Sequence, residues 1–296
     1  MKVYFPSYYN KFKCIAERCQ NSCCVGWEIT VDQKTLQKYE QSGREDILRH
    51  ISCGSIVLCD GGRCPFLTER GLCRIISELG EEYTSVICRE HPRFYHRIGE
   101  RIEGGIGASC EEAARIILSS DGYDSFVSVE KDSVDAPDET ELDTKAEREE
   151  IYAILSDRAL PFSARVEKIR DRYEIPKNIH TRDEWQEIFF SLEMLDESHR
   201  EIISVGKTVL NEEYSDCFER FLAYLIYRHA SVASSRDNLR ARIAFCLLLT
   251  EMLENSMAKN QLSEDGAAEL VRIISEEIEY SEDNTAALVF ELESLL

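Results

Sequence analysis

Ten of the twelve cysteines lie between Cys14 and Cys110, and this local enrichment constrains the fold more than any other feature of the chain. The first thirteen residues alternate basic, aromatic and polar side chains and contain no continuous apolar core of the kind found in signal peptides. In a reducing compartment, clustered thiols are typically metal ligands rather than disulfides. We therefore expect a cytoplasmic protein whose N-terminal part is a loop-rich module held together by metal.

The candidate ligands begin with the run Cys14-x4-Cys19-x3-Cys23-Cys24 and continue with four more widely spaced cysteines. Four thiolates close a tetrahedral zinc site or hold the four corners of a cubane iron–sulfur cluster. Because consecutive side chains point apart, Cys23 and Cys24 are not expected to bind the same ion. Eight thiols then form either two four-thiol sites or one site with spare cysteines, and iron and zinc both remain open. The eight candidates are Cys14, Cys19, Cys23, Cys24, Cys64, Cys73, Cys88 and Cys110.

The other four cysteines are weaker candidates for metal ligands. Cys53 and Cys59 lie in a glycine-rich loop, and Cys217 and Cys246 lie in stretches with helical apolar periodicity, where packing is the expected role. A disulfide framework and simple burial are the alternatives for the whole group, but ten cysteines in about one hundred residues exceed ordinary usage.

The pattern along the chain divides it into three parts. Glycine pairs, prolines and cysteines at irregular spacing leave room only for short elements before residue 120. Residues 121–150 hold twelve acidic and three basic residues, which indicates a linker or an exposed loop, although residues 126–129 could form a lone strand. Beyond them the apolar period is helical: Thr181 and Glu184 form a capping box, and 239–257 is the expected central buried helix. The predicted fold is mainly α, with a loop-rich cysteine and metal module (1–120), an acidic linker (121–150) and an all-helical bundle domain (151–296). The short elements expected in the module are a strand at 28–31 and helices at 34–39, 74–79 and 111–120.

The charge is as uneven as the cysteines. Residues 1–120 contain sixteen basic and sixteen acidic residues, so the formal net charge of −21 falls on the rest of the chain. Such a field repels phosphate backbones and attracts basic proteins, which argues against nucleic-acid binding. The plainer explanation of this charge is solubility. No apolar stretch approaches the ~20 residues that a transmembrane helix needs, so no membrane partner is expected.

Several motifs in order resemble the flagellin lysine-N-methylase family, which has an eight-cysteine zinc- or iron-chelating domain. They start with Phe5-Pro-Ser-Tyr-Tyr and Cys23-Cys24-Val-Gly-Trp27, and the resemblance covers residues 5–115. Residues 219–229 look like the aromatic helix of the same family. The resemblance implies a [4Fe–4S] enzyme that methylates surface lysines of flagellin from S-adenosylmethionine. The remaining motifs are Cys64-Pro-Phe-Leu, Leu72-Cys-Arg-Ile and Cys88-Arg-Glu-His-Pro-Arg93.

Other candidate chemistry has structural alternatives. Tyr8, Tyr9, Trp27 and Asp32 flank the first cysteines and would form an aromatic wall around an alkylammonium group, or simply the core of a small module. They therefore remain candidates without an assigned role.

The segment 104–110 has three glycines, as nucleotide-binding loops often do, but the sequence shows no hydrophobic strand before it. We therefore interpret it as a turn that brings Cys110 to the metal. His91 or His96 could replace a thiol at a metal, and Arg93 could bind a carboxylate or form a structural salt bridge. No catalytic residue, methyl-donor site or lysine site is assigned. Polar and radical transfer, and the oligomeric state, also remain open.

Two other functions remain alongside the enzyme. One is a non-catalytic metal-binding protein whose cluster is structural and whose acidic helical domain docks a basic partner. The other is an oxidoreductase that uses Cys23 or Cys24 as a redox thiol, which is disfavoured because no Cys-x-x-Cys motif in thioredoxin-like surroundings occurs.

Overall fold

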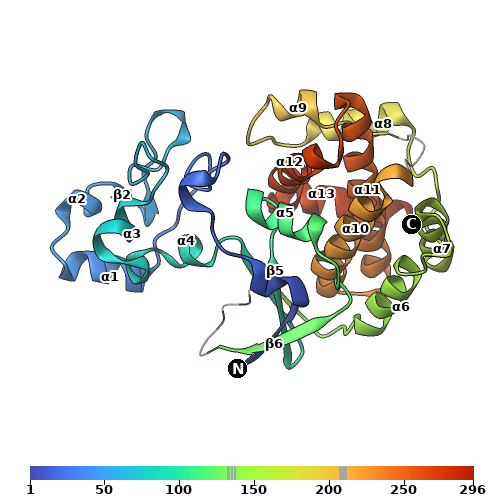
Figure 1. The fold of residues 1–296 in the computed structure, drawn as a ribbon, viewed down its shortest axis with the longest axis horizontal. Helices are drawn as coiled ribbons and strands as arrows, with labels where there is room; N and C mark the ends of the chain where they lie inside the picture. Colours follow the sequence, from blue (N-terminus) through green and yellow to red (C-terminus); the bar gives the residue numbers. More distant parts are fainter. Residues whose placement is uncertain (132–133, 135, 137, 207–211) are drawn as a thin grey trace. The chain divides into compact units, whose positions relative to one another are not determined.

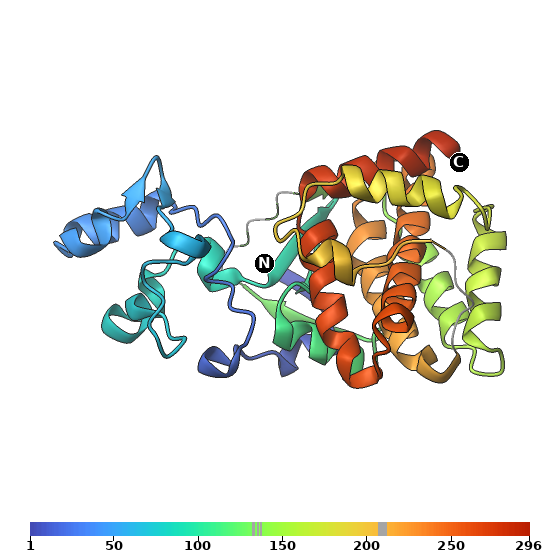
Figure 2. The same cartoon turned by 90° about the horizontal axis from the view of Figure 1, so that it is seen from above.

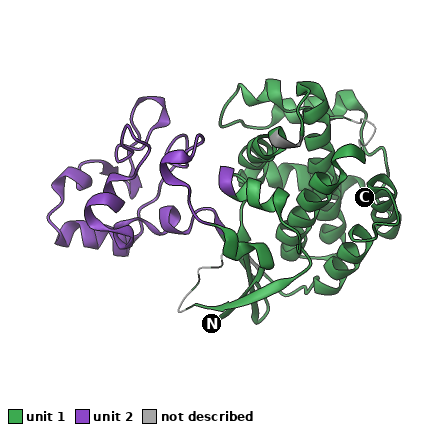
Figure 3. Cartoon of the chain, in the orientation of Figure 1, with its two compact units in different colours: residues 1–12, 94–109, 113–296 green, residues 13–93, 110–112 purple. Residues whose placement is uncertain are grey.

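A computed structural model describes residues 1–131, 134, 136, 138–206 and 212–296 of the chain (Figure 1). It divides into two compact units (Figure 3). Unit 1 comprises Met1–Phe12, Phe94–Ser109 and Ala113–Leu296, and unit 2 comprises Lys13–Arg93 and Cys110–Glu112. This division differs from the three predicted parts, because the first twelve residues and 94–109 belong to the larger unit.

Unit 2 is built from short elements around one small core. Asp32 caps α1 by accepting a hydrogen bond from the Thr35 amide (3.0 Å), and its other oxygen accepts from the Val86 amide. The helices predicted at 34–39 and 74–79 are confirmed as α1 and α3. The strand predicted at 28–31 is wrong, because the backbone there makes only an isolated bridge, Thr30 to Ser55. The elements are η2 (Ala16–Arg18), α1 (Gln33–Gln41), α2 (Glu45–Leu48), β2 (Ile51–Ser52), β3 (Ser55–Ile56), η3 (Asp60–Gly62), α3 (Arg74–Leu79), η4 (Glu81–Tyr83) and α4 (Val86–Glu90).

Unit 1 contains a five-stranded sheet in the order β6-β1-β5-β4-β7. β1 runs parallel to β5 and antiparallel to β6, and β7 is parallel to β4. The segment 121–150, expected as an acidic linker, therefore contributes two strands, and the first of them, β6, lies where a lone strand at 126–129 was the alternative. Pro137 lies outside the described residues. The strands are β1 (Lys2–Pro6), β4 (Arg93–Ile98), β5 (Arg101–Ile106), β6 (Phe126–Glu130) and β7 (Asp138–Thr140).

β6 forms despite its acidic surroundings because half-buried and exposed side chains alternate along it. Val127 and Val129 pack against a core that includes Val3 and Phe5, while the residues between them are exposed. A period of two is the pattern of a half-buried strand, and charged residues on the solvent side do not break it.

The remainder of unit 1 is helical, so the prediction of a mainly α chain is confirmed, although the sheet was not foreseen. The capping box predicted at Thr181 and Glu184 starts α8, and the expected central helix at 239–257 is α11, which contacts α10, α12 and α13 (Figure 2). None of the helices in the described ranges is both long and apolar enough to cross a bilayer. The helices are η1 (Ser7–Lys11), α5 (Glu111–Ser119), α6 (Lys145–Leu155), α7 (Phe162–Arg172), α8 (Arg182–Ser191), α9 (His199–Ile202), η5 (Glu212–Tyr214), α10 (Ser215–His229), η6 (Ala230–Val232), α11 (Arg236–Asn260), α12 (Glu264–Ile274), the π-helix η7 (Ser275–Glu279) and α13 (Glu282–Leu295).

Two buried contacts attach the helices to the sheet. The Tyr227 hydroxyl of α10 lies 3.1 Å from the carbonyl oxygen of Tyr4 and 3.0 Å from that of Gly104, in β1 and β5. Arg148 of α6 donates to both carboxylate oxygens of Glu103 at 2.8 and 2.9 Å. These contacts fix α10 and α6 to the strands and make the sheet and the helices one folding unit.

Candidate metal centre

All eight cysteines predicted as metal ligands fall in unit 2. Cys110 joins the other seven there although the intervening residues 94–109 belong to unit 1. These thiols range from buried (Cys64) to exposed (Cys14). Cys217 and Cys246, by contrast, are completely buried in α10 and α11 of unit 1, as their helical periodicity predicted.

Three of the eight, Cys24, Cys64 and Cys73, lie at the core of unit 2. The Cys64 amide donates to the Cys24 carbonyl oxygen at 2.8 Å, and Cys73 forms an antiparallel bridge with Leu67, three residues after Cys64. Cys64 is part of the apolar core of unit 2, and Cys24 and Cys73 pack against it. The turns of the chain thus bring together cysteines that are up to 49 residues apart in the printed sequence.

Cys88 of α4 completes this group. Burial and the neighbouring Cys24 and Cys73 thiolates raise the pKa of the Cys88 thiol to about 11. Burial first, and then Cys24, Cys73 and Cys88, raise the pKa of the Cys64 thiol to about 12. Each of these thiolates is therefore within electrostatic reach of the others. We call Cys24, Cys64, Cys73 and Cys88 the core set.

Glu111, at the start of α5, joins the segment that carries Cys14, Cys19 and Cys23 to Cys110. Glu111 accepts hydrogen bonds from the Gln20 amide (2.8 Å), the Asn21 amide (3.1 Å) and the Cys19 thiol (3.6 Å). This contact holds the loop of Cys19 beside Cys110, the residue that precedes Glu111. Burial and Glu111, followed by Cys110, raise the pKa of the Cys19 thiol to about 12. We call Cys14, Cys19, Cys23 and Cys110 the loop set.

The neighbours Cys23 and Cys24 link the two sets along the chain. A hydrogen bond from the Cys23 thiol, with further help from Ser22 and Arg63, lowers the pKa of the Cys24 thiol to about 7. The same pairing raises the pKa of the Cys23 thiol, as do burial, Cys110 and Cys14. A thiolate is the form that binds metal. The set of thiols is thus chemically suited to zinc or to an iron–sulfur cluster.

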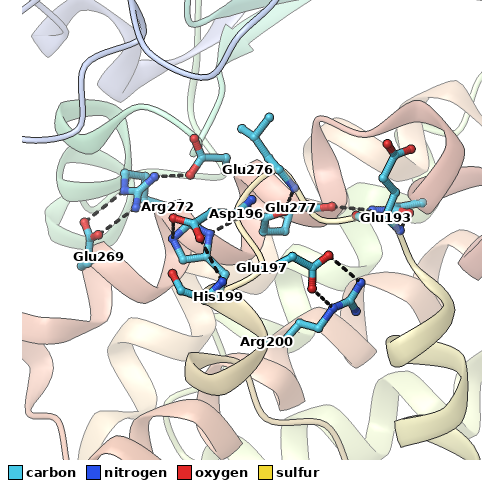
Figure 4. Close-up of polar contacts among 12 residues, drawn as sticks. Glu193, Asp196, Glu197, His199, Arg200, Glu269, Arg272, Glu276 and Glu277 are labelled. Carbon is cyan, nitrogen blue, oxygen red and sulfur yellow. Dashed lines mark hydrogen bonds and ion pairs between the residues drawn. The ribbon is translucent and has the colours of Figure 1, made fainter. Parts of the chain in front are cut away.

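A different group of possible metal ligands lies in unit 1. His199, Glu276 and Glu277 place ligand atoms within 4.8 Å of one another, and no other such set of three is found among the described residues (Figure 4). Glu277 is already saturated: it accepts from the Asp196 amide (3.1 Å), the Leu195 amide (2.6 Å) and the His199 ring (2.5 Å). A fully hydrogen-bonded carboxylate of this kind anchors a loop rather than binding an ion.

The aromatic helix noted in the sequence is α10, and its polar residues surround Glu279. The Tyr224 hydroxyl donates to Glu279 at 2.9 Å and accepts from the Ala108 amide at 3.0 Å, and the His229 ring lies 2.7 Å from the other carboxylate oxygen. Burial alone would raise the pKa of Glu279, but Arg228 and the hydrogen bond with His229 lower it to about 2. The network was not foreseen because Glu279 lies 50 residues from its histidine partner.

The aromatic wall suggested by the sequence is not brought together within either unit. Tyr8 is buried in unit 1, where Tyr9 stacks on Phe5 at 3.8 Å between ring centres, whereas Trp27 belongs to unit 2. The carboxylate of Asp32 is occupied as the cap of α1. The packing and capping roles therefore account for these residues.

The segment 104–110 needs one correction. A strand, β5, begins before it and includes its residues 104–106, and α5 follows it. Its glycines are nevertheless required by packing, because a Cβ atom at Gly104 would lie 2.6 Å from the Phe5 ring and one at Gly107 would overlap the Tyr280 hydroxyl. His91 lies in unit 2 three residues after Cys88, and burial and then Arg93 lower the pKa of its ring to about 4.

Unit 1 also holds a cavity of about 520 Å³ between α8, α9 and α11. Phe189 and Phe190 give it aromatic walls, and Arg182, Arg200 and Lys259 line it with positive charge. Its size is within the range of small-molecule and cofactor sites.

Comparison with known proteins gives three relatives from Salmonella. The chain is 30% identical over 128 residues to "Lysine-N-methylase" of Salmonella typhimurium and of Salmonella choleraesuis, and the match covers 38% of this chain and 32% of each relative. It is 30% identical over 128 residues to "Flagellar biosynthetic protein FliU" of Salmonella muenchen, covering 75% of that protein. The chain thus spans about a third of the length of the lysine-N-methylases and three quarters of FliU.

No family model matches the chain, and no solved structure matches it. The relationship is carried by the sequence match, which agrees with the family that the cysteine motifs resemble. The chain belongs to the lysine-N-methylase family.

Proposed function

We propose that this chain is a cytoplasmic iron–sulfur protein that transfers methyl groups from S-adenosylmethionine to surface lysines of flagellin. The observation that carries the proposal is the match to relatives named Lysine-N-methylase and FliU in a chain whose eight candidate thiols share one compact unit. In the transfer, the bond between sulfur and the methyl carbon breaks and a bond from the lysine nitrogen to that carbon forms. The amine must be neutral when it attacks.

The cysteines of unit 2 would hold the cluster. A cluster supplies thiolate-bound iron that can exchange electrons or stabilise the fold. Four thiolates can hold either the corners of a cubane iron–sulfur cluster or a single zinc ion, so zinc is the alternative.

The cavity of unit 1 is the proposed place for the methyl donor. An adenine ring stacks favourably on aromatic side chains such as Phe189 and Phe190, and the donor's carboxylate pairs with a guanidinium such as that of Arg182. Arg200 instead supports the wall of the cavity: it donates to the carbonyl oxygens of Phe189 (2.9 Å) and Leu192 (2.6 Å), and its Nε pairs with Glu197 at 2.7 Å.

The test is a methyl-transfer reaction with the full chain, purified without oxygen, on purified flagellin. We expect intact-mass measurement to show methyl groups added to flagellin lysines only when S-adenosylmethionine is present. The Phe189→Ala variant should bind the donor at least tenfold more weakly, whereas Phe290→Ala, at an exposed position of α13 that is not part of the cavity lining, should not. Metal-loaded protein that leaves flagellin unmethylated would contradict the enzymatic proposal.

A second candidate is a non-catalytic protein whose metal is structural and whose acidity docks a basic partner. The observation in its favour is the short match to the longer lysine-N-methylases, together with the net charge of −21. It predicts salt-sensitive binding of flagellin without methylation, so the same reaction mixture separates the two functions.

A further inference from the structure

We propose that a second cavity of unit 1 binds the alkylammonium side chain of the lysine that receives the methyl group. The cavity has a volume of about 350 Å³, and Arg182 and Asn255 line both it and the cavity proposed for the methyl donor. The identity of this acceptor rests on the proposed function, but binding of the side chain can be measured without methyl transfer.

The first argument is the position of this cavity. Methyl transfer requires reacting atoms that are held about 3–3.5 Å apart, so the donor and acceptor sites must adjoin. Arg182 lines both cavities, and so does Asn255, whose side-chain amide donates to the carbonyl oxygen of Gly206. Gly206 packs against Arg182, because a Cβ atom there would lie 2.5 Å from the Cγ atom of Arg182. The second cavity therefore shares a boundary with the first.

The second argument is that the lining suits the stem of a lysine side chain. Leu248 and Met252 lie one turn apart on α11 and are 7% and 2% exposed. Trp185 of α8 adds an indole ring, and the His180 ring packs against it nearly at right angles, with 4.8 Å between ring centres. His180 is itself anchored, because its Nε2 atom lies 2.7 Å from a carboxylate oxygen of Glu291. Methylene groups pack on such apolar side chains, and Trp is the aromatic residue that attracts cations most strongly.

The third argument is the carboxylate of Glu184, which lines this cavity. Its Oε2 atom accepts hydrogen bonds from the amide (2.7 Å) and the hydroxyl (2.8 Å) of Thr181, within the capping box of α8. These hydrogen bonds hold the pKa of Glu184 below its usual range, so the carboxylate is ionised near neutral pH. Among the described residues, no hydrogen bond or ion pair to its Oε1 atom is found. This oxygen can therefore accept a hydrogen bond from an ammonium group.

The other charged groups of the lining have partners in the structure or in the proposed donor complex. Lys177 lies 2.5 Å from Glu167, and Glu251 pairs with Arg170, so neither pair adds net charge. Arg182 repels an ammonium group when no donor is bound, but it is the residue proposed to pair with the donor's carboxylate. Bound donor should therefore strengthen the binding of lysine, and thermodynamic linkage makes this effect reciprocal.

The experiment measures the binding of two small probes to the full chain: Nα-acetyl-lysine amide, and Nα-acetyl-norleucine amide, which has a similar stem but no amine. The chain has two tryptophans, so fluorescence in a Trp27→Phe background reports on Trp185. The norleucine probe should bind about tenfold more weakly, because it lacks the ion pair and the cation–π contact. S-adenosylhomocysteine, which has no methyl group to transfer, should tighten binding of the lysine probe about fivefold.

Matched variants of α8 test the carboxylate. Glu184→Gln removes the charge but keeps a residue that also serves in capping boxes, so the lysine probe should bind about fivefold more weakly. Glu187→Gln, at an exposed position of the same helix outside the cavity lining, should leave the affinity within about twofold of the unchanged chain. Circular dichroism checks that each variant is folded. If Glu184→Gln does not fold, the comparison of the two probes in the unchanged chain still decides.

Several results would overturn the inference. If the lysine probe does not bind, or if both probes bind equally well, the cavity does not recognise an ammonium group. If a folded Glu184→Gln variant binds the lysine probe as well as the unchanged chain does, the carboxylate has no part in binding. If S-adenosylhomocysteine binds without affecting the lysine probe, the two cavities are independent and this one is not the acceptor site. Flagellin that stays unmethylated by a chain that binds the lysine probe as predicted would contradict the proposed function alone, so the two failures are distinguishable.

Discussion

The buried ion pair between Arg148 and Glu103 gives the sharpest test of the observed fold, because it joins α6 to the sheet. The Arg148 side chain is 3% exposed and that of Glu103 is 7% exposed, with two hydrogen bonds of 2.8 and 2.9 Å between them. Removing one partner of such a pair destabilises a protein by about 3–5 kcal/mol, since a charge stays buried. Arg101 still donates to Glu103 at 2.9 Å, so the lower part of that range is expected.

A cation–π contact adds to the effect, because the Arg148 guanidinium lies 5.5 Å from the centre of the Tyr227 ring. Such a contact contributes about 0.5–1 kcal/mol. We therefore expect Arg148→Ala to lower the free energy of unfolding by about 3–4 kcal/mol, measured by urea denaturation followed by circular dichroism of the helices.

The matched control lies in the same helix. Lys145 and Glu149 form a pair at 3.6 Å in which both side chains are 58% exposed. Exposed pairs of this kind contribute up to about 0.5 kcal/mol, so Lys145→Ala should change stability little. Replacement of both Arg148 and Glu103 by apolar residues of similar size should be less harmful than Arg148→Ala alone. A loss below about 1 kcal/mol for Arg148→Ala would show that α6 does not fold against the sheet.

Three further predictions follow from single side chains. The hydrogen bond to the Glu277 carboxylate raises the pKa of the His199 ring, so this pair stabilises the fold fully below the ordinary pKa of 6.5 and loses its effect as pH rises through the raised pKa. His199→Gln should therefore reduce stability in urea titrations more at pH 5.5 than at pH 9. An equal loss at both pH values would refute the charged pair. Gly107→Ala should cost about 1–3 kcal/mol in the same assay, because the new methyl group overlaps the Tyr280 hydroxyl; wild-type stability would contradict that packing. The double change of Cys217 and Cys246 to Ala should lower stability by about 1–2 kcal/mol per site without changing metal per chain, whereas loss of metal would place ligands in unit 1.

Much of the local structure was predictable from short-range signals. The capping box of Thr181 and Glu184 and the apolar period of α11 depend on residues within a few turns of each other, and both predictions are confirmed. The sheet was not predictable in this way. β1 and β5 pair across about one hundred residues, and the glycines at 104 and 105 lower the apparent strand propensity of β5.

For the candidate metal site, too, the local signal was readable in the sequence and the long-range contacts were not. The cysteine spacing identified eight candidate ligands, including Cys110, but not their grouping. That grouping depends on Glu111 reaching the amides of Gln20 and Asn21, 91 and 90 residues away. The division into units was likewise hidden, because the segment between Cys88 and Cys110 leaves the small unit for the sheet and then returns. Contacts of this range leave no periodic mark in a sequence.

The central claim is that unit 2 folds around metal bound by its cysteines. Hydrogen–deuterium exchange with mass spectrometry, on the full chain before and after metal removal by a chelator, tests it most directly. Structural metals contribute on the order of 10 kcal/mol to small domains. We therefore predict that amides of α1 and α3 lose their protection when metal is removed, while those of α10 and α11 keep theirs. Unchanged protection of α1 and α3 in the metal-free chain would contradict the claim.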